Sequence, residues 1–433
     1  MTVHLPQREI RRSFILGVVN GALFEFAERL IDPPLVLTWF VSRLTSSNLL
    51  VGLVAPLGDA GWFLPQVFIS GLVQRMPRKM LSYTLAAVIR AISWFLVAAA
   101  VWLVDDPTLL LITFFTLYGV ARLAAGLGGL GFFEVVAKTI PANRRGSFFA
   151  WRMLTGGLLG LGAGVVTQEV LNRFAFPHGH ALLFVIYNAV IIPAMLAFII
   201  IREPPGTAVP HSPTLRQQLR RVGHFLRKDA VFRRYMGMRT ALGLAGIALP
   251  FYGVYARNVL DAPEGMVGIY VAVRVAAGLV ANMPWGLVSD RKGNRVVTLG
   301  LSLGNAFTSL LALALAGWIT LSPSRGPWLP YLALPLFLLN GALTPALMLV
   351  GNNFLLELVP EAERPLYLGL SNTLIGVVVL ISGFGGLVVD LLGYAGLFGL
   401  STLLCLLAWW WSRGLPEPRV DQPPRGGNSL RAD

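Results

Sequence analysis

Long apolar runs separated by short polar turns dominate the chain. A helix of about 20 residues spans the roughly 30 Å hydrocarbon core of a bilayer. The pattern predicts twelve such helices, at residues 14–40, 48–73, 80–104, 108–136, 147–171, 181–201, 235–257, 266–289, 296–320, 328–357, 366–390 and 393–412. The predicted fold class is all-α and integral to the membrane.

One polar stretch, residues 202–234, interrupts this pattern. It opens with a proline-rich segment and continues with Leu215, Leu219 and Val222 at helical spacing against an arginine-rich face, which predicts an amphipathic helix on the membrane surface. Six predicted helices precede it and six follow. The expected organisation is an N-terminal segment 1–13, a six-helix bundle 14–201, the linker 202–234, a second bundle 235–413 and a disordered tail 414–433 rich in proline, glycine and arginine.

The two halves repeat short patterns at nearly constant spacing. Gly71-Leu72-Val73 and Gly286-Leu287-Val288 are 215 residues apart, Pro141 with Arg145 and Pro360 with Arg364 are 219 apart, and Glu203-Pro204 and Glu417-Pro418 are 214 apart. Matching positions of this kind predict two pseudo-symmetric bundles in parallel orientation.

Composition and charge placement agree with a membrane protein. Charged residues make up 13% of the chain, against about 25% in soluble domains. Of the 35 Lys and Arg, 25 lie on the side of the N-terminus, four lie in the opposite loops and six lie within predicted helices. This asymmetry predicts a multi-pass protein of the cell membrane with both termini and the linker in the cytoplasm. The net charge of +14 therefore indicates topology and contact with lipid, not nucleic-acid binding.

The residues that support metal or enzyme chemistry are sparse. The single Cys405 excludes a disulfide framework, and His178 and His180 alone supply too few ligands for a metal. The five histidines are scattered and no P-loop is present, which argues against the alternatives of a membrane-embedded enzyme or a sensor. We expect no enzyme activity, no metal and no cofactor.

Several charged residues fall within the predicted helices, where a charge usually faces a cavity or a partner. Glu25, Glu28, Arg29 and Asp32 share one stripe of the first helix, and Glu25 with Arg29 can pair, which leaves Glu28 less compensated. The alternative is an ion-pair stripe that only fixes packing. The candidate cavity residues are Glu25, Glu28, Arg29, Asp59, Arg122 and Arg274.

The repeat and the third helix give further information on three of the charged residues within the helices. Asp59 and Arg274 are repeat-mates of opposite charge, and an ion pair between them across a central cavity would offset both burial costs, but the spacing alone gives no distance between them. Arg90 lies in the middle of the third helix, and the sequence leaves open whether it turns inward or snorkels.

The turn GLVSDRKGNR at residues 286–295 resembles the loop signature of the major facilitator superfamily. The resemblance implies that Asp290 helps to hold one side shut, and the expected latch comprises Gly286, Asp290, Arg291, Gly293, Arg295, Arg145 and Arg364. Arg75 stands where the first half would carry the matching acid. Arg122 opens RLAAGLG, which is similar to an R-x-x-x-G-x-G pattern implicated in proton coupling in that family.

The expected function is secondary active transport of a small solute by alternating access. Proton coupling would run through Glu25, Glu28 and Asp59, with Glu28 the first choice, and the alternative is a facilitative uniporter. The expected partners are a small-molecule substrate, protons and membrane lipid, with no nucleic acid, and the expected state is a monomer. The identity of the substrate and the direction of transport stay open.

Overall fold

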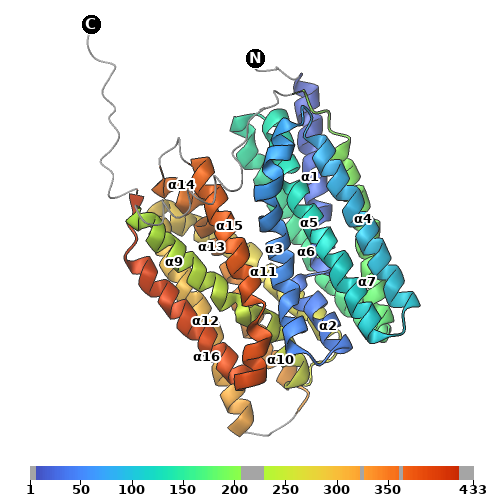
Figure 1. The fold of residues 1–433 in the computed structure, drawn as a ribbon, viewed down its shortest axis with the longest axis vertical. Coiled ribbons are helices and arrows are strands. Elements are labelled where there is room, and N and C mark those ends of the chain that lie inside the picture. The colour runs from blue at the N-terminus through green and yellow to red at the C-terminus, as the bar shows by residue number, and fades with distance from the viewer. Residues whose placement is uncertain (1–5, 206–228, 322–325, 360–363, 419–433) are drawn as a thin grey trace.

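The computed structural model describes residues 6–205, 229–321, 326–359 and 364–418, and these residues form an all-helical fold (Figure 1). Eight of the described helices are long and apolar enough to cross a membrane on their own. The first half consists of α1 (Gln7–Leu30), η1 (Pro33–Leu37), α2 (Thr38–Leu44), α3 (Asn48–Arg75), α4 (Met80–Leu103), α5 (Pro107–Thr139), α6 (Ala142–Arg173) and α7 (His178–Ile199).

The second half repeats this order of crossings. It consists of α9 (Ala230–Ala245), η2 (Gly246–Ala248), α10 (Leu249–Asn258), α11 (Met266–Lys292), α12 (Asn294–Leu321), η3 (Leu329–Ala333), α13 (Leu334–Met348), η4 (Leu349–Phe354), α14 (Leu355–Leu358), α15 (Arg364–Ser382) and α16 (Gly385–Arg413). The twelve crossings expected from the apolar runs are therefore confirmed.

Five crossings differ from the continuous helices that we expected. The first is broken between α1 and α2, where Pro33 and Pro34 follow Asp32 and a proline cannot donate the next helical hydrogen bond. The seventh is broken at η2, just before Pro250, and the tenth contains the irregular turns η3 and η4. The eleventh ends at Ser382, and Gly393, with a φ of 68°, kinks α16.

Equivalent helices pack in the same way in the two halves. In the first half α3 packs on α5 and α4 packs on α7; in the second half α11 packs on α13 and α12 packs on α16. The halves meet along two equivalent pairs, α6 with α11 and α3 with α15. This arrangement supports the repeat that the short sequence matches predicted.

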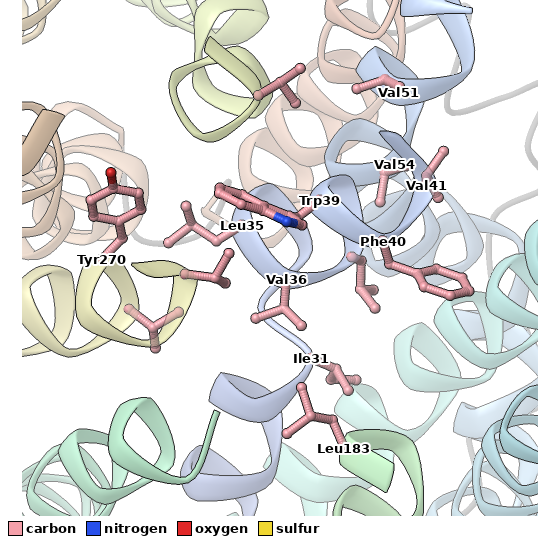
Figure 2. Close-up of a cluster of buried hydrophobic side chains, with 14 of the residues drawn as sticks. Ile31, Leu35, Val36, Trp39, Phe40, Val41, Val51, Val54, Leu183 and Tyr270 are labelled. Carbon is pink, nitrogen blue, oxygen red and sulfur yellow. The ribbon is translucent and has the colours of Figure 1, made fainter. Parts of the chain in front are cut away.

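The two halves share an apolar core at one end of the molecule. We call the end where α1 begins and α16 finishes the terminal end, and the opposite end the far end (Figure 1). At the far end, Leu35 and Trp39 belong to the same buried cluster as Tyr270 of the second half (Figure 2). Leu35 also packs within reach of Gly253 on α10.

The ends of the expected domains are only partly described. The predicted amphipathic helix lies almost wholly in residues 206–228, outside the described part. Of the expected disordered tail, residues 414–418 pack on the second half, because Leu415 and Glu417 are buried there. That part of the expectation is therefore corrected, and the rest of the tail lies outside the described residues.

Candidate functional site

Four acids and four arginines gather in the middle of the helices. They are Glu25, Glu28 and Arg29 on α1, Asp32 just after it, Asp59 on α3, Arg90 on α4, Arg122 on α5 and Arg274 on α11. Their charges sum to zero. Each would cost about 2.5–3.5 kcal/mol alone in a bilayer, so close pairing offsets much of the cost.

Glu28 lies between two arginines from neighbouring helices. Its carboxylate forms an ion pair with Arg90 and a second with Arg122, whose NH1 lies 3.2 Å from Oε2. The Nε of Arg90 donates to the hydroxyl of Tyr187 on α7 at 2.7 Å. The expectation that Glu28 is the less compensated acid is therefore wrong, because the sequence could not show that Arg90 turns inward.

Arg122 can approach α3 because two glycines leave room for it. Its Nε donates to the carbonyl of Gly58 at 3.0 Å, and a side chain on Gly61 would collide with the Cβ of Arg122. Gly126 serves the same contact from the other side, since a Cβ there would lie 2.8 Å from the carbonyl oxygen of Trp62. Gly126 of the RLAAGLG segment and Gly61 thus bring α3 and α5 close enough to fix Arg122.

A second set of ion pairs crosses between the halves. Arg274 of the second half binds both carboxylate oxygens of Asp32 at 2.8 Å. Arg29 lies 3.4 Å from the same carboxylate and 3.0 Å from that of Glu25. The Glu25–Arg29 pair is present as expected, whereas Arg274 pairs with Asp32 and not with its repeat-mate Asp59.

Asp59 differs from the other acids of the site. It is exposed, and among the described residues it has no ion pair. Arg122 and Arg274 are nevertheless near enough to act on it electrostatically, and so is Asp32. Asp59 therefore faces open space at the boundary between the halves, beside two arginines that are already bound to other carboxylates.

Polar contacts close the far end of this boundary. The indole of Trp39 donates to Glu264 at 2.8 Å, and Arg43 lies 3.4 Å from the same carboxylate. Two further contacts join the halves: Arg257 donates to Ser42 at 2.7 Å, and Asn48 donates to Asp390 at 2.7 Å. Together with the apolar cluster of Figure 2 they form what we call the far-end seal. No pattern in the sequence indicated that these residues meet.

The contact between α6 and α11 runs from the far end to about the middle of the two helices. Gly164 packs on Gly268, and Gly157 packs on Leu279. One turn nearer the terminal end, Met153 and Met283 have 50% and 72% of their surface exposed. The halves are thus in contact between the charged site and the far end. Between the charged site and the terminal end they carry exposed apolar side chains.

The residues expected to form a latch lie at the terminal end, where several of them secure helix ends. Arg145 donates to the carbonyl of Ala137 at 2.6 Å, and its repeat-mate Arg364 donates to that of Leu356 at 3.0 Å, each eight residues earlier in the chain. Gly293 has a φ of 84° and packs directly on the carboxylate of Glu417.

The other latch residues lie in the last turns of α11 and at the start of α12. Asp290 and Arg291 are exposed, and Gly286 borders open space. The backbone nitrogen of Arg295 donates to Glu417 at 2.9 Å. No described contact tests whether this turn also holds the two halves together.

Comparisons with known proteins agree with this architecture. The family description "Major Facilitator Superfamily" matches residues 236–432. A D-xylose-proton symporter has a similar structure, with a TM-score of 0.72, 17% identity and coverage of 95% of this chain and 99% of that one.

Two other transporters have similar structures. The nucleoside transporter NupG gives a TM-score of 0.65 at 16% identity and covers 94% of this chain and 98% of that one. A POT family transporter in complex with a thioalcohol-conjugated peptide gives 0.68 at 12% identity, with 93% and 94% covered. A comparison with curated protein sequences found no match. The sequence of the second half thus resembles the Major Facilitator Superfamily, and the whole chain shares the fold of these transporters.

Proposed function

We propose that the protein is a secondary active transporter that moves a small organic solute by alternating access. The observation that carries the proposal is the asymmetry of the boundary between the halves, which is sealed at the far end and exposed beyond the charged site. A solute could reach the charges from the terminal end in this state. Rocking of the halves would break the far-end seal and bring Met153 and Met283 together.

We further propose that protons drive the transport and that Asp59 carries them. Protonating Glu28 would break its ion pairs with Arg90 and Arg122, whereas a change of charge on Asp59 breaks none that the described residues form. Neutral Asp59 would also stop attracting Arg122, which binds Glu28, and Arg274, which binds Asp32 across the boundary between the halves. The first choice for the titrating group therefore moves from Glu28 to Asp59.

We propose that the terminal end faces the cytoplasm. The turn after α11 is proposed to act as a latch in the state in which the terminal ends of the two halves are closed. In the present state Arg295 is bound to Glu417 of its own half. When the terminal ends close, the exposed Asp290 and Arg291 would come near the first half. This role rests on the position of the turn at the mobile boundary and on its sequence.

The experiment begins with a thermal-shift screen of the purified protein against metabolites and drugs. Compounds that stabilise it are then tested for uptake into proteoliposomes under an imposed pH gradient. We expect uphill accumulation by the wild type and its loss in Asp59→Asn. Glu169→Gln is the matched control, because Glu169 is an exposed acid at the far end whose one ion pair among the described residues is with Arg173.

Alternation is tested separately with spin-label pairs in a Cys405→Ala background. Labels at positions 153 and 283 report the terminal side, and labels at 46 and 391 report the far side, where both positions are exposed. Substrate should shorten one distance while it lengthens the other. Flux that does not depend on the pH gradient would indicate a uniporter. Distances that do not change in opposite directions would contradict alternating access.

A further inference from the structure

An open pocket of about 370 Å³ lies on the second half at the terminal end. It is formed where α9 begins and α16 finishes, and these two helices pack side by side (Figure 1). The wall exposes polar atoms as well as aromatic rings, and its residues are Arg234, Trp410, Trp411, Arg413 and Gly414. One water molecule needs about 10–15 Å³ in a cavity, so the pocket has room for a polar group much larger than water.

The pocket lies where the lipid-facing surface of α16 ends. Leu403, Leu407 and Trp410 follow one another at helical spacing and have 64%, 45% and 60% of their surface exposed. Exposed apolar side chains along one face of a membrane-spanning helix contact lipid chains. The helix ends at Arg413, and tryptophan beside a basic residue is typical of the level of the lipid headgroups.

Two arginines of the pocket carry charges that no carboxylate neutralises within the described residues. Arg234 and Arg413 are both exposed, and neither has an acid of the described ranges within ion-pair distance. Asp229, which precedes α9, is engaged elsewhere, because its carboxylate accepts from the backbone nitrogen of Phe232 and from the hydroxyl of Tyr367. The pocket therefore has a positive charge of two.

Both guanidiniums are positioned by contacts that leave donors for a ligand. NH1 of Arg234 donates to the carbonyl of Gly414 at 2.7 Å, and the rest of this exposed guanidinium is part of the pocket wall. The guanidinium of Arg413 lies 5.0 Å from the centre of the Trp409 ring. A cation over a ring face is held by the ring's quadrupole, so this contact uses none of the in-plane N–H donors.

The backbone at the pocket also favours a negative group. The last carbonyls of a helix repel an anion when they are bare. At the end of α16 the carbonyl of Gly414 accepts from Arg234, and that of Arg413 accepts from Arg295 at 2.8 Å. The start of α9 lies beside them and presents the positive end of its own dipole.

From these observations we propose that the pocket binds the headgroup of an anionic phospholipid, with the phosphate between Arg234 and Arg413 and an acyl chain along Leu403 and Leu407. This site is separate from the boundary between the halves, so the proposal does not depend on the proposed transport. A zwitterionic headgroup would bring its own cation to two arginines, whereas an anionic one adds only negative charge. With the terminal end cytoplasmic, as proposed above, the pocket lies in the leaflet that has the negative surface potential.

The test is native mass spectrometry of the purified full-length protein in detergent, titrated with dioleoyl phosphatidylglycerol or with dioleoyl phosphatidylcholine. The two lipids share their phosphate and their chains and differ in net charge. We expect the wild type to bind one phosphatidylglycerol more tightly than any further copies. The first phosphatidylcholine should bind at least about fivefold more weakly, since a basic residue near the headgroups contributes about that factor.

Variants locate the tight site. Arg234→Gln and Arg413→Gln should each weaken the first phosphatidylglycerol about fivefold and change phosphatidylcholine little, and the double variant should lose the preference for phosphatidylglycerol. Arg234→Lys keeps the charge and should keep the preference. Arg8→Gln is the control, because Arg8 is an exposed arginine at the terminal end of the first half, and it should leave the tight site intact. The melting temperature of each variant without added lipid checks folding.

The same titrations distinguish other occupants of the pocket. Equal affinity of the wild type for the two lipids would overturn the proposal, as would a folded double variant that binds phosphatidylglycerol like the wild type. Displacement of the first phosphatidylglycerol by millimolar inorganic phosphate would assign the pocket to a soluble anion and overturn the lipid. A dimer that Trp410→Ala converts to a monomer would assign this surface to a second copy of the chain, which also overturns the proposal.

Discussion

Glu203 and Glu417 perform the same structural task in the two halves of the molecule. The carboxylate of Glu203, just after α7, accepts from the backbone nitrogens of Lys79 and Met80 at 2.9 and 2.7 Å, where α4 begins. The carboxylate of Glu417, just after α16, accepts a hydrogen bond at 2.9 Å from the backbone nitrogen of Arg295, where α12 begins. In each half the chain leaving the last helix thus binds the positive end of the third helix.

Gly293→Ala should destabilise the second half through this contact. Gly293 has a φ of 84° and touches the Glu417 carboxylate, so an alanine meets both backbone strain and a collision. We expect a loss of about 1–3 kcal/mol in the free energy of unfolding, measured by denaturant titration in detergent.

Two further variants identify the cause of that loss. Gly286→Ala is the control, because Gly286 lies within a helix and has nothing within 4 Å of its would-be Cβ, and it should change stability little. The double variant Gly293→Ala/Glu417→Ala should lose less than the sum of its single variants. Additive losses would show that backbone strain alone is responsible.

The crossings of the fold could be predicted because an apolar run of about 20 residues is visible without any knowledge of packing. The breaks could not be predicted from proline alone. Pro33 and Pro34 coincide with a break, whereas Pro56, Pro65 and Pro284 lie inside continuous helices. In a membrane a proline is tolerated where neighbouring helices compensate the freed backbone groups, and the sequence does not show those neighbours.

The members of the charged site could be predicted better than their partners. An ionised side chain in an apolar run is conspicuous, and this identified all eight positions. For Arg90 the sequence left open whether the side chain turns inward or snorkels. Pairing depends on helix rotation and on the break after α1. That break places Asp32 within 2.8 Å of Arg274, so the opposite charges of Asp59 and Arg274 did not make them partners.

Arg274→Gln should weaken the contact between the halves. Asp32 is buried with 3% of its surface exposed, and without Arg274 its one remaining ion-pair partner in the described chain is Arg29 at 3.4 Å. Removing one partner of a buried pair costs about 3–5 kcal/mol, and Arg29 should keep the cost near the lower end. The melting temperature of the purified protein measures the loss. Arg274→Gln combined with Asp32→Asn should be more stable than Arg274→Gln alone, and a double variant that is less stable would contradict the pairing.

Glu264→Gln should loosen the far-end seal and favour its open state. The carboxylate of Glu264 binds Trp39 and Arg43 across the boundary, and an amide would lose the charge that Arg43 contacts. We expect a larger fraction of long distances between spin labels at positions 46 and 391. Since Arg43 is half-exposed to solvent, the shift should be modest. An unchanged distance distribution would show that the apolar cluster alone closes the far end.

Asp290→Asn should change the rate of transport more than the affinity for solute. Asp290 lies in the exposed turn at the terminal end, distant from the mid-helix charges. Initial rates in proteoliposomes and the Kd of the solute identified by the thermal-shift screen are measured on the same preparation. We expect the rate to change and the Kd to stay within a few-fold. Arg8→Gln, which removes an exposed charge near the start of α1, should alter neither quantity.

Glu28→Gln should destabilise the first half because it leaves two guanidiniums without their shared carboxylate. Arg90 has only 5% of its surface exposed and would keep one described hydrogen-bond acceptor, the hydroxyl of Tyr187. We expect a loss of about 3–5 kcal/mol in the free energy of unfolding. Adding Arg90→Met should recover part of this loss, since it removes the buried charge while an unbranched apolar side chain fills the space. If Glu28→Gln alone is as stable as the wild type, the Arg90–Glu28–Arg122 arrangement contributes no stability, and Glu28 regains its place as a candidate proton carrier beside Asp59.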